Sequence, residues 1–135
     1  MTRYSKGSNA ERELLKMLFE KGFSVVRAAG SGKTSLPSPD IVALNSTKKL
    51  AFECKAWDSE YLSIPVEQIE EQLSWATRAG AEFFVVWKMP REGFYFLAST
   101  DFVRTEKSFA ITKKTAYKKG LRLEVLLGEQ SRLKV

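Results

Sequence analysis

A run of five consecutive apolar side chains at residues 83–87 (Phe-Phe-Val-Val-Trp) constrains the fold more than any other feature of this chain. A strand that is apolar at every position is typical of a sheet covered on both faces, because each face then needs a second layer to bury it. We therefore expect strand 82–89 to lie inside a layered structure, followed by a turn at 90–92 and an antiparallel return at 94–98.

Apolar periodicity and capping residues place the remaining elements. Ser8 is expected to cap the first long helix, which Gly22 ends, and Ser63 to cap the second, with Pro65 in its first turn and Gly80 at its end. The predicted helices span 8–21, 63–79, 112–119 and 121–127, the remaining strands span 23–28, 40–44 and 50–57, and residues 58–62 form a loop. This order predicts an α/β fold, a central mixed β-sheet flanked by helices, in a single domain over residues 1–135.

The composition excludes several kinds of chemistry. The 135 residues include no histidine, which excludes histidine-ligated zinc and histidine general bases, and one cysteine, Cys54, which excludes cysteine-cluster zinc sites and a disulfide within the chain. Residues 1–8 are polar, and no apolar run approaches the roughly 18 residues of a membrane span. We therefore expect a cytoplasmic protein without membrane contact, in which carboxylates, lysines or hydroxyls act with an oxygen-binding metal.

Charge is distributed unevenly along the chain, which carries 22 Lys and Arg against 16 Asp and Glu. Residues 1–39 hold 7 basic and 3 acidic side chains, residues 40–100 hold 6 and 9, and residues 101–135 hold 9 and 4. Two basic segments, 1–8 and 101–135, indicate a polyanion binder that keeps its carboxylates for another purpose, with Arg3 and Lys6 as candidate DNA contacts. A mildly basic protein with no such partner is the alternative.

Three acidic residues stand at positions that favour burial. Asp40 opens a strand that is otherwise apolar, Glu53 lies in the middle of a strand, and Glu11 falls on the apolar face of the first helix. Converging carboxylates repel one another unless a cation neutralises them, and Mg²⁺ accepts such oxygen ligands. Lys55 leaves the sheet on the same face as Glu53 and would either orient the attacking water or stabilise charge on a phosphate. The arrangement Asp40, then Glu53-Cys54-Lys55, is the PD-(D/E)xK pattern of metal-dependent nucleases.

Each of these residues also has a simpler interpretation. Glu11 would complete a capping box with Ser8, and Asp40 would cap a turn after the preceding proline. Glu53 and Lys55 would form a solvated cross-strand face. No one of these interpretations explains why all four residues fit a single site.

The glycine- and proline-rich loop at 30–39 contains Gly32-Lys33-Thr34, which resembles the end of a phosphate-binding P-loop. That motif needs a glycine where Arg27 stands and a helix where residues 36–39 (Leu-Pro-Ser-Pro) prevent one, so the sequence argues against a P-loop NTPase. We interpret the loop as one that presents Ser31 and Lys33 to a DNA phosphate.

Four segments together resemble the archaeal Holliday junction resolvases of the Hjc type, in the family's order and spacing. They are residues 7–14 (Gly-Ser-Asn-Ala-Glu-Arg-Glu-Leu), residues 26–31 (Val-Arg-Ala-Ala-Gly-Ser), Asp40 with residues 52–55 (Phe-Glu-Cys-Lys), and residues 123–128 (Leu-Glu-Val-Leu-Leu-Gly). The resemblance implies a restriction-endonuclease-like fold, a homodimer, and Mg²⁺-dependent paired nicking of four-way DNA junctions in recombination and repair, with Mn²⁺ as an alternative metal.

The resemblance also implies roles for individual residues. Glu11, Asp40 and Glu53 match the metal-site carboxylates, and Lys55 matches the catalytic lysine. Arg12, Arg27 and Ser31 match positions near the scissile phosphate, and Trp75 is the candidate contact of the dimer, with ordinary core packing as its alternative. A sliding clamp is a further candidate partner.

Two other functions stay open on the sequence alone. One is a related nuclease that cuts flaps or other branched or duplex DNA, because a fold does not fix a substrate. The other is a non-catalytic basic module that binds nucleic acid, which would gain nothing from carboxylates facing a phosphate.

Overall fold

The computed structural model describes residues 3–28 and 36–129, with side chains from residue 7 onward. Two sheets form its framework: a five-stranded mixed sheet in the order β1-β2-β3-β5-β6 and a three-stranded antiparallel sheet in the order β4-β8-β7. The helices are α1 (Arg3–Glu20), α2 (Val66–Ala79), α3 (Lys113–Lys119) and α4 (Leu123–Leu126), with a 3₁₀ turn η1 (Ser99–Asp101). The strands are β1 (Ser24–Arg27), β2 (Ile41–Leu44), β3 (Lys49–Lys55), β4 (Tyr61–Pro65), β5 (Glu82–Met89), β6 (Gly93–Leu97), β7 (Val103–Arg104) and β8 (Ser108–Thr112).

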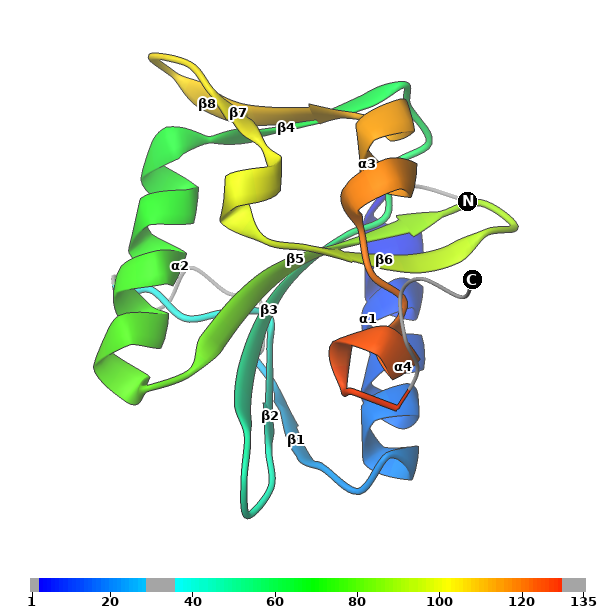
Figure 1. Cartoon of the computed structure of the whole chain (residues 1–135), viewed down its shortest axis with the longest axis vertical. Helices are drawn as coiled ribbons and strands as arrows, with labels where there is room; N and C mark the ends of the chain where they lie inside the picture. Colours follow the sequence, from blue (N-terminus) through cyan, green and yellow to red (C-terminus); the bar gives the residue numbers. More distant parts are fainter. Residues whose placement is uncertain (1–2, 29–35, 130–135) are drawn as a thin grey trace.

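The large sheet is buried on both faces, as the apolar run predicts. Helix α1 lies on one side, and α2 with the small sheet lies on the other (Figure 1). Strand β3 shows both layers, because Leu50, Phe52 and Cys54 belong to the core beneath α1 while Ala51 belongs to the core beneath α2. The predicted alternation of β3 is therefore confirmed, as are the bounds of β5 and its antiparallel pairing with β6.

Helix α1 begins five residues earlier than predicted. It starts at Arg3, so Ser8 lies inside the helix and neither caps it nor forms a capping box with Glu11. Gly7 and Ser8 are weak helix formers, but burial of the following apolar stripe against the sheet overrides that preference. The predicted end is correct, because Gly22 adopts φ +93, a conformation that glycine tolerates.

The segment before α2 is a strand, where a loop and a helix start were predicted. Residues 61–65 form β4, which pairs antiparallel with β8, and α2 begins at Val66 with Pro65 at its N-cap. The signal was present as a period of two, since Leu62 and Ile64 are buried and their neighbours are not. The predicted end of α2 at Gly80 is correct, with φ +71.

The region after residue 100 was predicted in part. Helices α3 and α4 were expected, and Thr112 caps α3 by accepting a hydrogen bond from the Thr115 amide. Strands β7 and β8 were not expected. Strand β8 pairs with β4, which lies more than 40 residues earlier in the chain, and β7 is a two-residue strand that pairs with β8 and carries little local signal.

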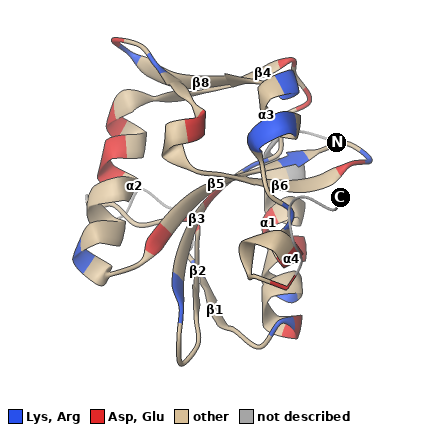
Figure 2. Cartoon of the chain, viewed as in Figure 1, with Lys and Arg blue, Asp and Glu red and all other residues tan. Residues whose placement is uncertain are grey.

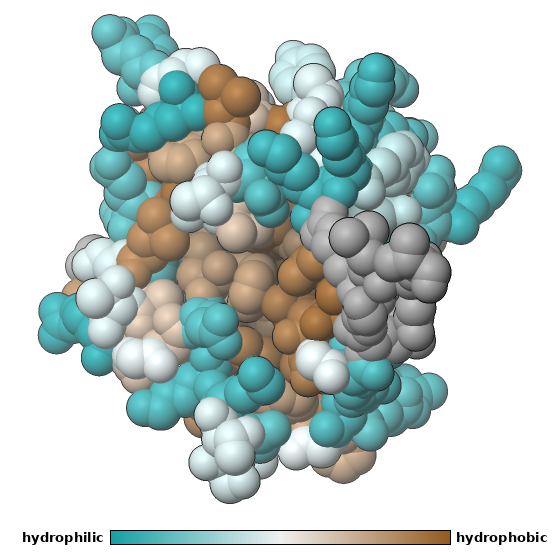
Figure 3. Space-filling model, in the orientation of Figure 1, coloured by the Kyte–Doolittle hydropathy of each residue, from teal (hydrophilic) through white to brown (hydrophobic). Residues whose placement is uncertain are grey.

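The surface is divided by charge and by polarity. Figure 2 shows acidic residues along α2, where Glu67, Glu70 and Glu71 are exposed, and lysines in α3. Between α2 and α4, the face seen in Figure 3 has an apolar hollow over the middle of the large sheet, with a hydrophilic rim. None of the described helices is long and apolar enough to cross a membrane.

Candidate active site

Asp40 stands immediately before β2, beside the middle of β3. Its backbone amide donates a hydrogen bond to the Phe52 carbonyl, and its carboxylate Oδ2 accepts one from the Cys54 amide at 2.9 Å. The two contact points, Phe52 and Cys54, flank Glu53 on β3, so Asp40 is held directly beside Glu53. The predicted pair of carboxylates is therefore built by the register of a single hairpin.

Glu53 is only 4% exposed, because it lies in the middle of a strand beneath α2. Its Oε2 accepts a hydrogen bond from Nε2 of Gln68 on α2 at 2.6 Å. The same oxygen lies 3.3 Å from Nζ of Lys55, two residues along the strand. The alternation of β3 thus places Glu53 and Lys55 on one face, as predicted, and the interpretation as a solvated face is wrong.

Burial and neighbouring negative charge raise the pKa of both carboxyl groups, Asp40 and Glu53. Burial raises the pKa of Glu53 to about 7, and the charge of Asp40 adds to the rise while Lys55 opposes it. Burial also raises the pKa of Asp40, against the hydrogen bond from the Cys54 amide, and the charge of Glu11 raises it further. Negative charge is therefore concentrated at this point of the sheet.

Glu11 reaches the same region from α1 but binds a different partner. Its Oε1 accepts a hydrogen bond from Nε of Arg27 on β1 at 2.7 Å, and Nη2 of Arg27 lies 3.3 Å from the Ser8 hydroxyl. The charge of Glu11 nevertheless contributes to the raised pKa values of Asp40 and Glu53. The structure thus gathers Glu11, Arg27, Asp40, Glu53 and Lys55 at one place.

The other predicted residues lie elsewhere or outside the described part of the chain. Arg12 is exposed on α1, and Trp75 is half-buried on α2, where it packs against the core. Arg3 and Lys6 belong to α1, but their side chains are outside the description, and Ser31 and Lys33 lie outside the described residues altogether.

Two glutamines of α2 were missed by the sequence analysis. Gln68 binds Glu53, and Gln72, one turn later, donates from Nε2 to the Ser38 carbonyl at 2.9 Å. Gln72 is 6% exposed and lies among the buried apolar residues of α2. A polar residue on an apolar helix face needs a partner, and that mismatch was the available signal.

The donor set suits a divalent cation. Among residues 3–28 and 36–129, no three acidic or cysteine side chains converge closely enough to hold a metal ion. Two adjacent, mostly buried carboxylates whose pKa values are both raised by burial and by neighbouring negative charge are, however, hard oxygen donors in need of positive charge. Because Mg²⁺ is usually held by one or two carboxylates together with substrate phosphates, Asp40 and Glu53 fit it.

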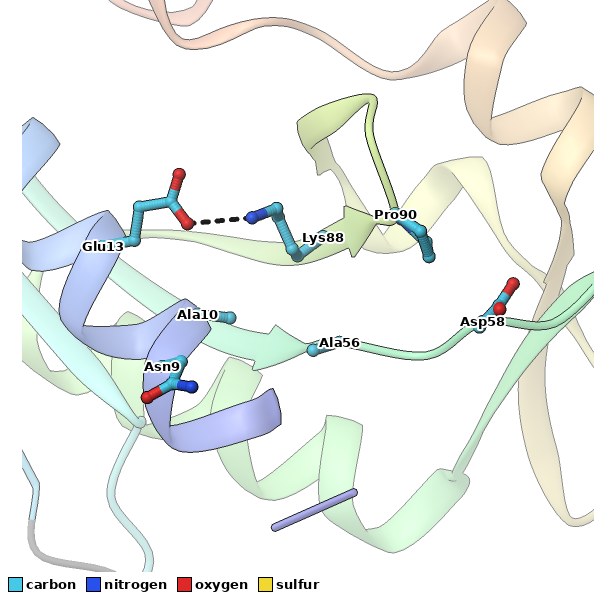
Figure 4. A pocket seen from close by; sticks show the side chains of 7 residues that line it. All are labelled: Asn9, Ala10, Glu13, Ala56, Asp58, Lys88 and Pro90. Atoms are coloured by element: carbon cyan, nitrogen blue, oxygen red, sulfur yellow. Dashed lines mark hydrogen bonds and ion pairs between the residues drawn. The ribbon is translucent and has the colours of Figure 1, made fainter. Parts of the chain in front are cut away.

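A hollow of about 390 Å³ flanks this site (Figure 4). Its wall includes Ala56, which directly follows Lys55, and Glu13 of α1 reaches across to Lys88 of β5 at 2.8 Å. Asp40 and Glu53 do not line it. The hollow therefore adjoins the end of the catalytic strand and does not contain the carboxylates.

Comparison with known proteins identifies the family. The family model described as "Archaeal holliday junction resolvase (hjc)" matches residues 2–135. The crossover junction endodeoxyribonuclease Hjc of Archaeoglobus fulgidus is 38% identical over 125 residues, which cover 93% of this chain and 91% of that protein. The protein of the same name from Sulfurisphaera tokodaii is 36% identical over 126 residues, covering 91% and 86%.

Solved structures agree with the sequences. The structure of the Archaeoglobus fulgidus Holliday junction resolvase Hjc matches with a TM-score of 0.83 at 34% identity, over 94% of this chain and 99% of that one. A bacterial homing endonuclease matches with a TM-score of 0.57 at 16% identity, which shows a shared fold. The restriction-endonuclease-like fold is thus confirmed, and the chain belongs to the archaeal Holliday junction resolvase family.

Proposed function

We propose that the chain is a structure-selective endodeoxyribonuclease that resolves four-way DNA junctions by paired, symmetric nicks during homologous recombination and repair. The observation that carries this proposal is the group formed by Asp40, Glu53 and Lys55 on neighbouring strands, with Lys55 Nζ 3.3 Å from Glu53 Oε2. Family membership over residues 2–135 supports the junction as substrate.

The proposed mechanism assigns a different role to each residue of the site. Asp40 and Glu53 would hold the divalent cation, which when bound supplies Lewis-acid stabilisation of the phosphate and an activated water. Lys55 presents a cation to the charge that develops on the phosphate. Arg27, in contact with Glu11, offers a guanidinium to a neighbouring phosphate. We propose Mg²⁺ as the metal, with Mn²⁺ as an alternative, because both take oxygen ligands.

Charge indicates how DNA would lie on the protein. Exposed Glu67, Glu70 and Glu71 make the outer face of α2 repulsive to phosphate, whereas the lysines of α3 are attractive (Figure 2). We propose that Arg12 and Arg27, with Arg3, Lys6, Ser31 and Lys33, contact the DNA arms. A sliding clamp stays a predicted partner.

We further propose a homodimer. The apolar hollow between α2 and α4 (Figure 3) is a surface that a second copy would cover, and Trp75 on α2 remains the candidate contact. Two sites related by a two-fold axis match a junction with pseudo-two-fold symmetry, which would account for paired nicks. Sedimentation of wild type and Trp75→Ala tests this point, since a dimer contact predicts a shift toward monomer.

One experiment tests the main proposal. Purified protein is incubated with a labelled four-way junction and an equimolar linear duplex, with Mg²⁺ or with EDTA. Symmetric, Mg²⁺-dependent nicks confined to the junction are expected. Equal cutting of both substrates would leave a nuclease without junction selectivity, and binding without cutting would leave a non-catalytic module.

A further inference from the structure

Helix α2 carries no residue that the proposed chemistry needs, yet it makes two polar contacts with the site. Gln68 and Gln72 are one helical turn apart and so project from the same face. Gln68 binds the Glu53 carboxylate, and Gln72 binds the backbone carbonyl of Ser38, two residues before Asp40. The helix therefore bridges the two chain segments that supply the two carboxylates.

The contact to Glu53 is the shorter of the two that its Oε2 makes. Gln68 Nε2 lies at 2.6 Å, against 3.3 Å for Lys55 Nζ. A lysine that also donates to a phosphate shares its three N–H groups between the phosphate and the carboxylate. The amide of Gln68 has no such second task, so it can keep Glu53 oriented while Lys55 also contacts the substrate.

Gln72 gives an independent indication that α2 does more than pack against the sheet. Its Oε1 is buried without a hydrogen-bond partner, the one such side-chain atom among the described residues. An unpaired buried acceptor is unfavourable, and an apolar side chain of similar size would pack there more favourably. The hydrogen bond from Gln72 Nε2 to the Ser38 carbonyl offsets this cost. Ser38 lies between Pro37 and Pro39, which have no backbone N–H, so this segment has few backbone donors of its own.

We propose that Gln68 is a positioning residue for Glu53, and Gln72 for the Ser38–Pro39 approach to Asp40, so that α2 sets the geometry in which the two carboxylates bind a divalent cation. This inference rests on the proposed function. The contacts of both glutamines are to protein groups, the Glu53 carboxylate and the Ser38 carbonyl, so the role assigned to them is exerted through the two carboxylates.

The test measures metal binding on the full chain without DNA. Mn²⁺ affinity is determined from the free-ion electron paramagnetic resonance signal for wild type, Gln68→Met, Gln72→Leu and the control Glu71→Met, an exposed site on the same helix. Loss of a partner that orients a metal ligand typically weakens metal binding 10- to 100-fold. We expect about a tenfold loss for Gln68→Met, a smaller loss for Gln72→Leu, and wild-type affinity for the control.

Two further readouts separate positioning from folding. The melting temperature of Gln72→Leu should equal or exceed that of wild type while its Mn²⁺ affinity falls, an opposition that a purely structural residue would not produce. Junction affinity in EDTA should be unchanged for both glutamine variants, and their cleavage should recover at saturating metal. Wild-type Mn²⁺ affinity in Gln68→Met with a normal melting temperature would overturn the inference, whereas absence of Mn²⁺ binding in wild type would instead contradict the metal site of the proposed function.

Discussion

The two long helices approach the carboxylates from opposite faces of the large sheet with different chemistry. Helix α1 presents Glu11, whose partner Arg27 is charged and 31% exposed at its side chain. Helix α2 presents uncharged amides, and Gln72 is almost fully buried. A charged, partly exposed pair can exchange its partner for a phosphate, whereas buried amides keep theirs. The α1 side is thus suited to respond to substrate, and the α2 side to hold the site still.

The largest effect is expected where the two sides meet, at the carboxylates themselves. Asp40→Ala and Glu53→Ala should each reduce metal-dependent junction cleavage by about a thousandfold or more, because each removes an oxygen donor and the charge that binds the cation. Single-turnover cleavage of a labelled junction measures this loss, with binding in EDTA as the control for folding. Intact cleavage in both variants would refute the nuclease proposal.

Lys55→Ala should come next, with a loss of about a hundredfold or more in the cleavage rate. Junction affinity should change little, because the variant removes a group that acts on the reacting phosphate and little contact area. Parallel cleavage and gel-shift assays test the separation. Loss of binding together with cleavage would indicate misfolding and would count against a purely chemical role for Lys55.

Arg27→Ala breaks the pair on the α1 side. We expect cleavage to fall about tenfold to a hundredfold, and the slope of log affinity against log salt to decrease by about one, because one phosphate contact is lost. Gln68→Met is the comparison on the α2 side, since it should leave that slope unchanged. An unchanged slope in Arg27→Ala would show that Arg27 holds Glu11 and does not contact DNA.

A stability measurement tests the electrostatics of the buried side. The pKa of Glu53 rises on folding from 4.5 to about 7, so the folded state favours the protonated acid. Its contribution to stability is therefore fully present below about pH 4.5 and is lost as the pH rises through 7. In EDTA at pH 8, Glu53→Gln should unfold with a free energy higher than wild type by on the order of 2 kcal/mol.

The same comparison at pH 4 serves as the internal control, because both proteins are then uncharged at this position. The melting temperatures should converge there and separate by about 5 °C at pH 8. Glu71→Gln, an exposed substitution on the same helix, should show no such pH-dependent gap. A gap that persists unchanged at pH 4 would contradict an electrostatic origin.

Local patterns predicted the parts of the site that depend on local geometry. The alternation of β3 placed Glu53 and Lys55 on one face, and the hairpin brought Asp40 beside them. The sequence could not show that Gln68 binds Glu53, because a helix and a strand 15 residues apart meet only through the tertiary fold. Strand β4 was missed for a related reason, since its partner β8 is distant in sequence and a capping serine with a following proline favoured a helix start.

The smallest effect concerns the start of α1, and its size decides between two possible helix starts. If Ser8 capped the helix, Ser8→Ala would destabilise the protein by about 1 kcal/mol. Because α1 begins at Arg3, Ser8 is an interior helical residue, where alanine is favoured over serine by a few tenths of a kcal/mol, roughly. The substitution also removes the hydrogen bond that Ser8 Oγ accepts from Arg27 at 3.3 Å, which is long and weak and opposes this gain only slightly. We therefore expect a change in unfolding free energy within about 0.5 kcal/mol of zero, measured by urea denaturation. A loss near 1 kcal/mol would return the helix start to Ser8 and would remove the basic first turn from the α1 side of the site.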